Sequence, residues 1–314
     1  MLPLRSAFRR LKTSSDGCCK CRVCGADSVV FLCQTFNEHS RSEWLDNCKC
    51  KECGSVFIGN IISPEELAQA YSTLDKNRYY QETADASAQK FKSVVRDLKQ
   101  LASPSARILD IGGGDGALLT ALSEHGFNQL SLHEIPGSSS PKQGSTYDVY
   151  RDADYRTIPD GSFDVVTMMD VLEHVPDPDW TISAAKRLLR PGGFLYVHTP
   201  VVTALDRVMH VMQKMPVGGG LGRAWQRVRT SIFHLQNYTP RALLLLLEKH
   251  QFEIVRLDSI NELSWPLSRY VRVYLVEKRG VPNGLGWLIG VLLAPLVRSR
   301  LNLNKAVLLA RLRS

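Results

Sequence analysis

The stretch RILDIGGGDG, residues 107–116, decides the fold of this chain. A short apolar strand carries Asp110 near its end, and a glycine-rich turn follows before a helical run. Glycines at such a turn let the backbone approach a ligand closely, and the N-terminus of a helix favours an anionic group. The spacing of Gly112, Gly114 and Ala117 also fits dinucleotide-binding proteins. The turn therefore predicts a ligand site in an α/β sheet, and the following strands decide which ligand it takes.

Further apolar strands follow this turn, and acids stand next to their ends. These strands are expected at residues 129–133, 147–150, 163–169 and 190–200. Glu134 follows the first of them, where a carboxylate can accept both hydroxyls of a ribose. Asp152 follows the second, where it can accept from an adenine amine, and Asp170 follows the third. Strands that alternate with helices imply a parallel sheet, with ligands outside the carboxyl ends of the strands.

Residues 108–200 resemble the class I S-adenosylmethionine-dependent methyltransferase family. The resemblance rests on LDIGGGDG (109–116), Glu134, DA (152–153), FDVVTMMDVLEHVPDP (163–178) and RPGGFLYVHTP (190–200). It continues in HLQNYTP (234–240) and in the helical run 243–252. The family implies an α/β, Rossmann-like sheet of seven strands, mostly parallel with the last strand antiparallel. Strands at 252–259 and 306–312 would then pair antiparallel at one side of that sheet.

The resemblance also implies a role for each residue of the expected S-adenosylmethionine site. The backbone of Gly112, Gly114 and Gly116 would contact the methionine part of the cofactor, and Asp110 would orient that part. Glu134 would bind the ribose. Asp152 and the amide of Ala153 would bind the adenine, and Asp170 would contact the methionine end. The alternative for each acid is a helix cap or an exposed turn.

All eight cysteines lie between Cys18 and Cys53, and four of them form two C-x2-C-G pairs. The pairs are Cys21 with Cys24 and Cys50 with Cys53. Each pair can form a tight turn with both thiolates facing one ion, and four thiolates suit a closed, structural zinc site. The alternatives are a redox pair, free thiols, or Cys48 in place of Cys50. The module resembles the small zinc ribbon that precedes many methyltransferase domains.

These patterns divide the chain into four parts. They are a basic tail (1–17), the zinc-ribbon module (18–60), a helical linker (61–105) and the methyltransferase domain (106–314). In the linker, Ser63 is expected to cap a helix, because Pro64 and Glu66 suit its first turn. A second linker helix is expected over residues 88–101. Two insertions, 201–233 and 262–300, interrupt the methyltransferase domain.

The first insertion is expected to form a lid over the acceptor site. Residues 218–220 are three glycines and would act as its hinge. Arg223, Arg227 and Arg229 follow closely, and they would bind a phosphate on the acceptor, such as a nucleotide-sugar or polyprenyl phosphate. The alternative is a solvated basic face of a helix.

Histidines near the strand ends are the candidates for acid–base work, because a hydroxyl acceptor needs a base near neutral pH. His234 follows the lid insertion and is the preferred candidate for an acceptor-side catalytic residue. His174 lies in the LEH motif of the family, where fixing the loop is the alternative role. His198 lies on an expected buried strand and is interpreted as a core histidine.

The second insertion contains GLGWLIGVLLAPLV, residues 284–297, which carries no charge. It is shorter than the roughly 20 residues that span a bilayer, and Pro295 interrupts it. One interpretation is a helix in the membrane interface, anchored by Trp287, Arg298 and Arg300. The other, which the sequence favours, is a core helix packed on the sheet or on a second subunit.

The net charge of +8 is concentrated at the two ends of the chain. Residues 1–22 and 278–314 together carry +12, which leaves −4 for residues 23–277. This distribution argues against nucleic acid as a partner and allows contact of the ends with an anionic surface. Neither a secretory signal nor a membrane-spanning run is present, so a cytoplasmic protein is expected, at most peripheral on a membrane through 284–300.

The leading functional hypothesis is methyl transfer from S-adenosylmethionine to a small or lipid-linked metabolite. A sugar or glycan intermediate is the favoured acceptor class, with O-methylation slightly preferred. One alternative is an RNA base methyltransferase that holds RNA with the ribbon. The other is a non-catalytic protein that keeps the cofactor-binding fold as a scaffold.

Overall fold

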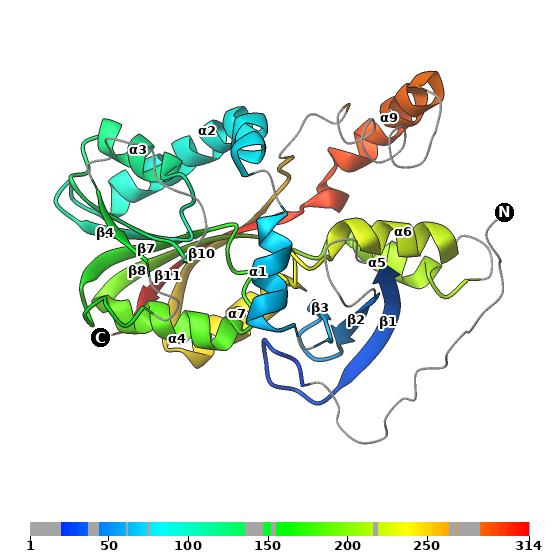
Figure 1. The fold of residues 1–314 in the computed structure, drawn as a ribbon, viewed down its shortest axis with the longest axis horizontal. Helices are drawn as coiled ribbons and strands as arrows, with labels where there is room; N and C mark the ends of the chain where they lie inside the picture. Colours follow the sequence, from blue (N-terminus) through cyan, green and yellow to red (C-terminus); the bar gives the residue numbers. More distant parts are fainter. Residues whose placement is uncertain are drawn as a thin grey trace.

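A computed structural model describes residues 20–36, 44–60, 62–73, 76–135, 147–151, 155–215, 219–263, 268 and 283–313. A seven-stranded sheet lies at its centre, in the order β10-β11-β8-β7-β4-β5-β6 (Figure 1). The strands are β4 (Arg107–Ile111), β5 (Gln129–His133), β6 (Asp148–Tyr150), β7 (Phe163–Met169), β8 (Leu189–Pro200), β10 (Phe252–Ile260) and β11 (Lys305–Leu312). Strands β8, β7, β4, β5 and β6 are parallel to one another, and β11 is antiparallel to both β8 and β10. The predicted fold class is therefore confirmed.

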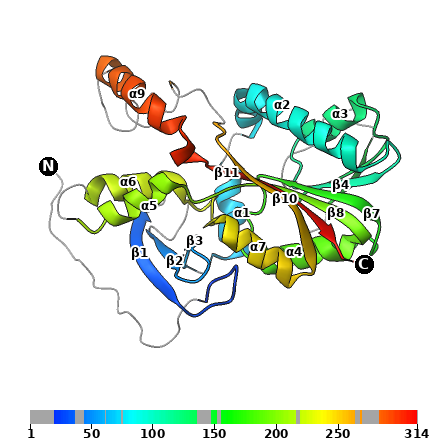
Figure 2. The same cartoon turned by 180° about the vertical axis from the view of Figure 1, so that it is seen from behind.

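Helices cover both faces of this sheet. One face carries α2 (Lys76–Leu101) and α3 (Ala117–Glu124), and the other carries α4 (Pro178–Leu188) and α7 (Pro240–Lys249) (Figures 1 and 2). Strand β4 is buried on both sides, so Ile108 packs into the cluster under α2 and α3 while Leu109 packs into the cluster under α4 and α7. The linker helix α2 begins at Lys76, twelve residues before its predicted start.

The cysteine-rich module forms a second, four-stranded sheet. Three antiparallel strands come from the module itself: β1 (Val29–Phe36), β2 (Trp44–Cys50) and β3 (Val56–Ile58). The fourth, β9 (Gln236–Asn237), comes from the methyltransferase half of the chain and pairs antiparallel with β3. The short helix α1 (Pro64–Ser72) follows, and Ser63 caps it by accepting from the amide of Glu66.

The first insertion folds as two helices, α5 (Ala204–Met212) and α6 (Gly219–Arg229), and α6 lies against β1. Buried polar groups join these helices to the small sheet: Gln226 Nε2 donates to Asn47 Oδ1 at 3.2 Å, and Thr230 Oγ1 also bonds Asn47. Gly219 and Gly220 lie in the first turn of α6, and residue 218 lies outside the described ranges, so the hinge stays a prediction.

Two of the three arginines predicted to bind a phosphate, Arg227 and Arg229, contact other parts of the protein. Arg229 is only partly exposed and its guanidinium binds Asp206 at 3.0 Å, because Asp206 is a buried acid that needs a counter-charge. Arg227 lies over the ring of Phe36, 5.7 Å from its centroid. Arg229 is thus occupied in holding α6 to α5, and its assignment as a phosphate ligand is wrong.

Helix α9 (Asn283–Val297) projects away from the large sheet (Figures 1 and 2). A short 3-10 helix, η2 (Arg300–Asn302), joins its end to β11. Trp287 and Leu292 each expose 68% of their surface, so the expectation is wrong for packing on the sheet, whereas packing on a second subunit stays a prediction. Among the described helices, none has the length and apolar character needed to cross a membrane.

Candidate functional site

The turn between β4 and α3 has a backbone that only glycine adopts easily. Gly112, Gly114 and Gly116 have φ of 66°, 60° and 79°, in the left-handed region. A Cβ at Gly112 would lie 2.7 Å from Val171 Cγ2, and one at Gly116 would overlap the hydroxyl of Tyr147. The turn therefore presents bare backbone at the carboxyl end of β4, as the sequence predicted.

Asp110 lies directly beneath this turn and is fully buried. Its Oδ1 accepts from Thr167 Oγ1 at 2.6 Å, whereas its Oδ2 has no hydrogen-bond partner. Burial raises the pKa of Asp110 to about 7, and the nearby Glu134 carboxylate adds to this rise, while Thr167 opposes it. A buried carboxyl oxygen without a partner is costly, so this atom is suited to a ligand group that donates to it.

Glu134 follows β5 and turns its carboxylate over the glycine turn. Its Oε2 accepts from the amide of Gly114 at 3.0 Å, and its Oε1 accepts from the amide of Ile135 at 3.0 Å. Because β4 and β5 are parallel neighbours, Glu134 and Asp110 come to the same edge of the sheet. Asp152 and Ala153, the predicted adenine contacts, lie outside the described residues.

Asp170 lies at the carboxyl end of β7, with an unusual φ of 56°. Its carboxylate binds Lys90 Nζ at 2.6 Å, accepts from His198 Nδ1 at 2.9 Å, and also binds Lys305. Although burial opposes ionisation, Lys305, His198 and Lys90 hold the pKa of Asp170 well below its usual range. Glu262 lies on the other side of the His198 ring, 3.3 Å from Nε2. His198 therefore sits between two carboxylates, where the sequence suggested only a core histidine.

His174 and His234 meet beyond the ends of β7 and β8. Their rings lie 4.8 Å apart, edge to face. His174 Nδ1 contacts the hydroxyl of Tyr71 at 3.2 Å and the carbonyl of Phe233, which fixes the ring. Burial, and then the neighbouring His174, lower the pKa of His234 well below its usual value. His234 is therefore neutral at physiological pH, which is the state in which an imidazole can accept a proton.

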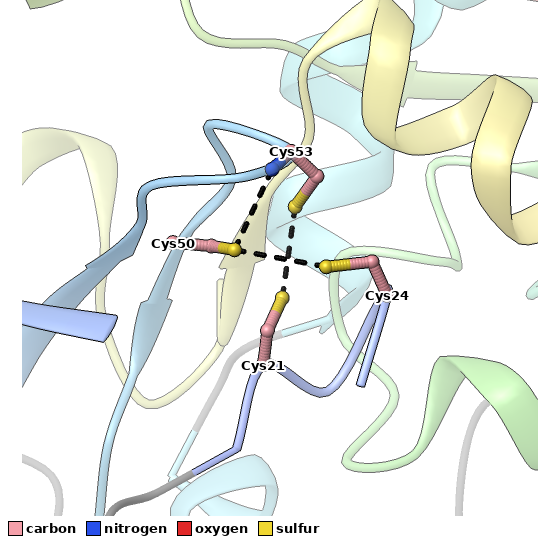
Figure 3. Close-up of side chains that lie close together, drawn as sticks. All are labelled: Cys21, Cys24, Cys50 and Cys53. Atoms are coloured by element: carbon pink, nitrogen blue, oxygen red, sulfur yellow. Dashed lines mark hydrogen bonds between the residues drawn. The ribbon is translucent and has the colours of Figure 1, made fainter. Parts of the chain in front are cut away.

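The four cysteines of the two C-x2-C-G pairs point toward one centre (Figure 3). Cys21 Sγ lies 3.6 Å from Cys53 Sγ, Cys24 Sγ lies 3.6 Å from Cys50 Sγ, and all four sulfurs lie within 4.8 Å of one another. A zinc ion bound by thiolates at about 2.3 Å in a tetrahedron places the sulfurs roughly 3.8 Å apart. The sulfur positions therefore fit this ion, and Cys48 is not part of the group.

Both cysteine turns have the same local geometry. The amide of Gly25 donates to the carbonyl of Cys21 at 2.8 Å, and the amide of Gly54 donates to that of Cys50 at 3.1 Å. Both glycines have a left-handed backbone, with φ of 75° and 78°. The second turn is also fixed to the large domain, because Thr239 Oγ1 donates to the carbonyl of Cys53.

A family model described as a methyltransferase domain matches residues 80–257, more than half of the chain. The chain belongs to this methyltransferase family. Its domain is of class I, the S-adenosylmethionine-dependent kind, and both the glycine turn and Glu134 lie within the matched residues.

Among curated relatives, "Ubiquinone biosynthesis O-methyltransferase" of Xanthomonas campestris pv. campestris (strain B100) is 37% identical over 108 residues, 32% of this chain and 45% of that protein. The protein of the same name from Thiobacillus denitrificans is 35% identical over 105 residues, 30% of this chain and 44% of that protein. The chain thus spans less than half the length of these relatives.

Solved structures give weaker matches. A methyltransferase from Archaeoglobus fulgidus aligns with 70% of this chain and 94% of its own, at 17% identity and a TM-score of 0.45. The cyclopropane synthase MmaA2 from Mycobacterium tuberculosis aligns with 71% of this chain and 83% of its own, at 16% identity and a TM-score of 0.47.

The described part of the methyltransferase domain fits the cofactor. The glycine turn presents left-handed backbone without side chains at the end of β4, Asp110 offers an unpartnered buried oxygen, and Glu134 presents two carboxylate oxygens at the end of β5. The glycine turn and Asp110 would hold the methionine part of the cofactor, and Glu134 would hold the ribose. The chemistry of the donors therefore agrees with S-adenosylmethionine.

Several residues of the methyltransferase site were not found from the sequence. Lys90 and Lys305 reach Asp170 from α2 and β11, and Tyr71 reaches His174 from α1. Lys305 is the one of these with a signal in the sequence, because a lysine that opens a buried strand needs a counter-charge. Lys90 and Tyr71 lie on helix surfaces, where nothing in the local pattern separates them from solvent-facing residues.

Proposed function

We propose that the protein transfers a methyl group from S-adenosylmethionine to a hydroxyl of a small or lipid-linked metabolite, such as a sugar or glycan intermediate. The observation that carries this proposal is the arrangement of the glycine turn, Asp110 and Glu134 at the carboxyl ends of β4 and β5. O-methylation is supported by the O-methyltransferase names of the curated relatives. The acceptor class is supported by the +12 charge of the two chain ends, which suits anionic or membrane-linked compounds.

The cofactor supplies a methyl group that is already activated on a sulfonium, so the protein mainly positions the two reactants. Glu134 would exchange its bonds to backbone amides for bonds to the ribose. Asp110 would become ionised as its free oxygen accepts from the bound cofactor. Neither residue takes part in bond making, and both are expected to act through cofactor affinity.

On the acceptor side, His234 would take the proton of the attacking hydroxyl. A base near neutral pH typically contributes about a hundredfold to ten-thousandfold in rate. His174 acts as a positioning residue, because Tyr71 and the Phe233 carbonyl fix its ring against that of His234. The low pKa of His234 keeps its imidazole neutral near pH 7, so that a ring nitrogen is free to accept a proton.

Isothermal calorimetry with S-adenosylmethionine tests the cofactor half of the proposal. Glu134→Gln should weaken binding by roughly 10- to 100-fold, because it removes a charged acceptor from the ribose. Glu124→Gln, the same change at an exposed helix end, is the matched control and should leave binding unchanged. Absence of binding at millimolar cofactor, or equal binding by both variants, contradicts the proposal.

An acceptor screen with cofactor labelled in the methyl group tests the second half. Label should appear on an oxygen of the product, and His234→Gln should lower kcat by at least about a hundredfold while cofactor affinity stays unchanged. His125→Gln, at an exposed position on the far end of α3, is the control. Label on nitrogen or carbon would reject O-methylation, and a normal kcat for His234→Gln would reject its role as the base.

We also propose that Cys21, Cys24, Cys50 and Cys53 hold a structural zinc ion. The sulfur distances support this ion, as do the two glycine turns that repeat the same backbone geometry. Four thiolates leave no open coordination position, so the ion would stabilise the ribbon and not take part in methyl transfer. Metal analysis of the purified protein should find one zinc per chain.

A further inference from the structure

Helix α9 exposes large apolar side chains to solvent, whereas an ordinary surface helix exposes polar ones. Among the α9 side chains that the structure describes, the exposed ones share the spacing of one helical face and are Gly284, Trp287, Leu288, Val291, Leu292 and Pro295. The four large side chains of this face expose between 47% and 68% of their surface. Exposed apolar stripes of this kind mark surfaces that contact a partner or a membrane.

A second exposed apolar stripe lies next to the base of α9. On α5 and just after it, Val208, Val211 and Met215 expose 54%, 64% and 53% of their surface. The 3-10 helix η2 contacts both α5 and α9, and its Leu301 is 54% exposed. The apolar surface therefore continues from α9 through η2 to α5.

Charge decides what this surface fits. Arg298 and Arg300 follow α9 directly and are exposed. A second copy of the chain on this face would bring like charges together, whereas anionic lipid headgroups complement them. Tryptophan and arginine beside an apolar face are also the residues that anchor helices at a bilayer surface.

The length of α9 sets how it meets a bilayer. Its 15 residues extend about 22 Å, less than the hydrocarbon thickness of roughly 30 Å. No charged side chain lies within Asn283–Val297, and Trp287 lies near the opposite end from Arg298. The helix therefore fits the plane of the interface better than a path across the membrane.

The base of α9 is fixed to the edge of the large sheet that carries the site. Asn261 Nδ2 donates to the carbonyl of Val297 at 2.6 Å, and Asn304 Nδ2 donates to the carbonyl of Glu262 at 2.7 Å. Glu262 in turn binds His198, and Lys305 binds Asp170. A surface bound by α9 would thus have a fixed position relative to the carboxyl edge of the large sheet, where Asp170 and His198 lie.

We propose that α9, with η2 and the outer stripe of α5, docks on an anionic membrane surface. Trp287, Leu288, Val291 and Leu292 enter the interface, and Arg298 and Arg300 bind headgroups. The docking stands without the proposed methyl transfer, because it uses none of the cofactor residues. Where both hold, the acceptor reaches the site from the bilayer, which favours the lipid-linked class.

Flotation of the full chain with lipid vesicles tests the docking. Wild-type protein should float with vesicles of phosphatidylcholine and phosphatidylglycerol and much less with phosphatidylcholine alone, and added salt should release it. Leu288→Glu/Leu292→Glu should weaken binding at least about a hundredfold. Leu245→Glu/Val255→Glu adds the same charge at exposed apolar positions on α7 and β10 and should bind like wild type.

A second variant separates lipid binding from loss of folding. Arg298→Ser/Arg300→Ser keeps the apolar face and should weaken binding to anionic vesicles roughly 30-fold, with a shallower dependence on salt. Calorimetry with S-adenosylmethionine checks that each variant has a folded cofactor site, or circular dichroism does so if that cofactor fails to bind. Wild-type protein that stays in solution with anionic vesicles at low salt overturns the proposal. So does a dimer in sedimentation that Leu288→Glu/Leu292→Glu abolishes without any effect on vesicles.

Discussion

The two sides of the catalytic edge differ in how far apart their residues lie in the sequence. On the cofactor side, Asp110, the glycine turn and Glu134 come from one segment, residues 110–134. On the acceptor side, His174 contacts Tyr71 and His234, and Asp170, the acid expected at the methionine end of the cofactor, binds Lys90 and Lys305 from equally distant segments. The first side is a local motif, whereas the second exists only after distant segments pack. Mutations far from the site should therefore impair the acceptor side more than the cofactor side.

The largest test of this difference is loss of the zinc site. Cys50→Ser should reduce bound zinc from about one per chain to none and lower the midpoint of thermal unfolding, because structural zinc contributes roughly 10 kcal/mol in zinc-finger peptides. Turnover of acceptor should be lost, since the segment that carries His234 pairs with β3 and bonds Cys53. Binding of S-adenosylmethionine should persist, because Asp110 and Glu134 are held by Thr167, Gly114 and Ile135, none of which lies in the ribbon.

Cys33→Ser is the matched control for this change. Cys33 is buried in the same small sheet but lies outside the group of four sulfurs. It should cost little stability and leave the zinc content unchanged, as measured by atomic emission. A Cys50→Ser protein that retains one zinc, or that loses cofactor and acceptor binding together, would erase the distinction between the two sides.

A smaller effect is expected from crowding the cofactor turn. Gly116→Ala places a Cβ where the Tyr147 hydroxyl lies, whereas Gly126→Ala has no atom within 4 Å of its new Cβ. Both glycines have positive φ, so both variants carry a left-handed strain of about 1 kcal/mol. Only Gly116→Ala should also weaken binding of S-adenosylmethionine, by at least about tenfold in calorimetry, with acceptor-side packing intact. Equal affinities in the two variants would remove the turn from the site.

A separate effect concerns the pH dependence of Asp110. Its pKa of about 7 in the folded protein exceeds the ordinary value of 3.8. The unfolded chain therefore loses this proton first, so Asp110 favours folding below about pH 4 and loses this contribution as pH rises to about 7. Relative to Asp110→Asn, wild-type protein should lose unfolding free energy across that window in denaturant titrations. Parallel profiles for the two proteins would contradict the raised pKa.

The raised pKa of Asp110 also predicts that cofactor binding releases a proton. Near pH 7 about half of Asp110 is protonated, so cofactor binding should release roughly half a proton if the bound cofactor stabilises the carboxylate. Calorimetry in buffers of different ionisation enthalpy measures this release, and Asp110→Asn should abolish it. Asp115→Asn, on the same turn, serves as the control.

The sheet and the cofactor side could be predicted because their signals are local. The boundaries of β5 and β7 were read from apolar runs, and Glu134 from its place after one of them. The contacts of Asp170 could not be read in this way, because Lys305 and Asp170 are brought together by the antiparallel pairing of β11 with β8. Their contact depends on register across the sheet, which no single segment encodes.

Two other features escaped prediction for different physical reasons. Strand β9 has two residues, too few for an apolar period, and its place beside β3 is set by packing of Tyr238 near the cysteine turns. The uncharged run of α9 suited the core by composition alone. Composition does not record that α2, α3, α4 and α7 already lie on the two faces of the large sheet.

The pairing of β9 with β3 also sets the order in which the chain can mature. Strand β3 ends at Ile58, but the strand that covers its edge begins at Gln236, after five strands of the large sheet have been synthesised. During synthesis, the edge of β3 therefore stays unpaired until residues 236–237 have been added to the chain. For anyone building chimaeras, the exchangeable piece is consequently residues 20–60 together with 201–239, and a transplanted N-terminal fragment alone would carry an unprotected β edge.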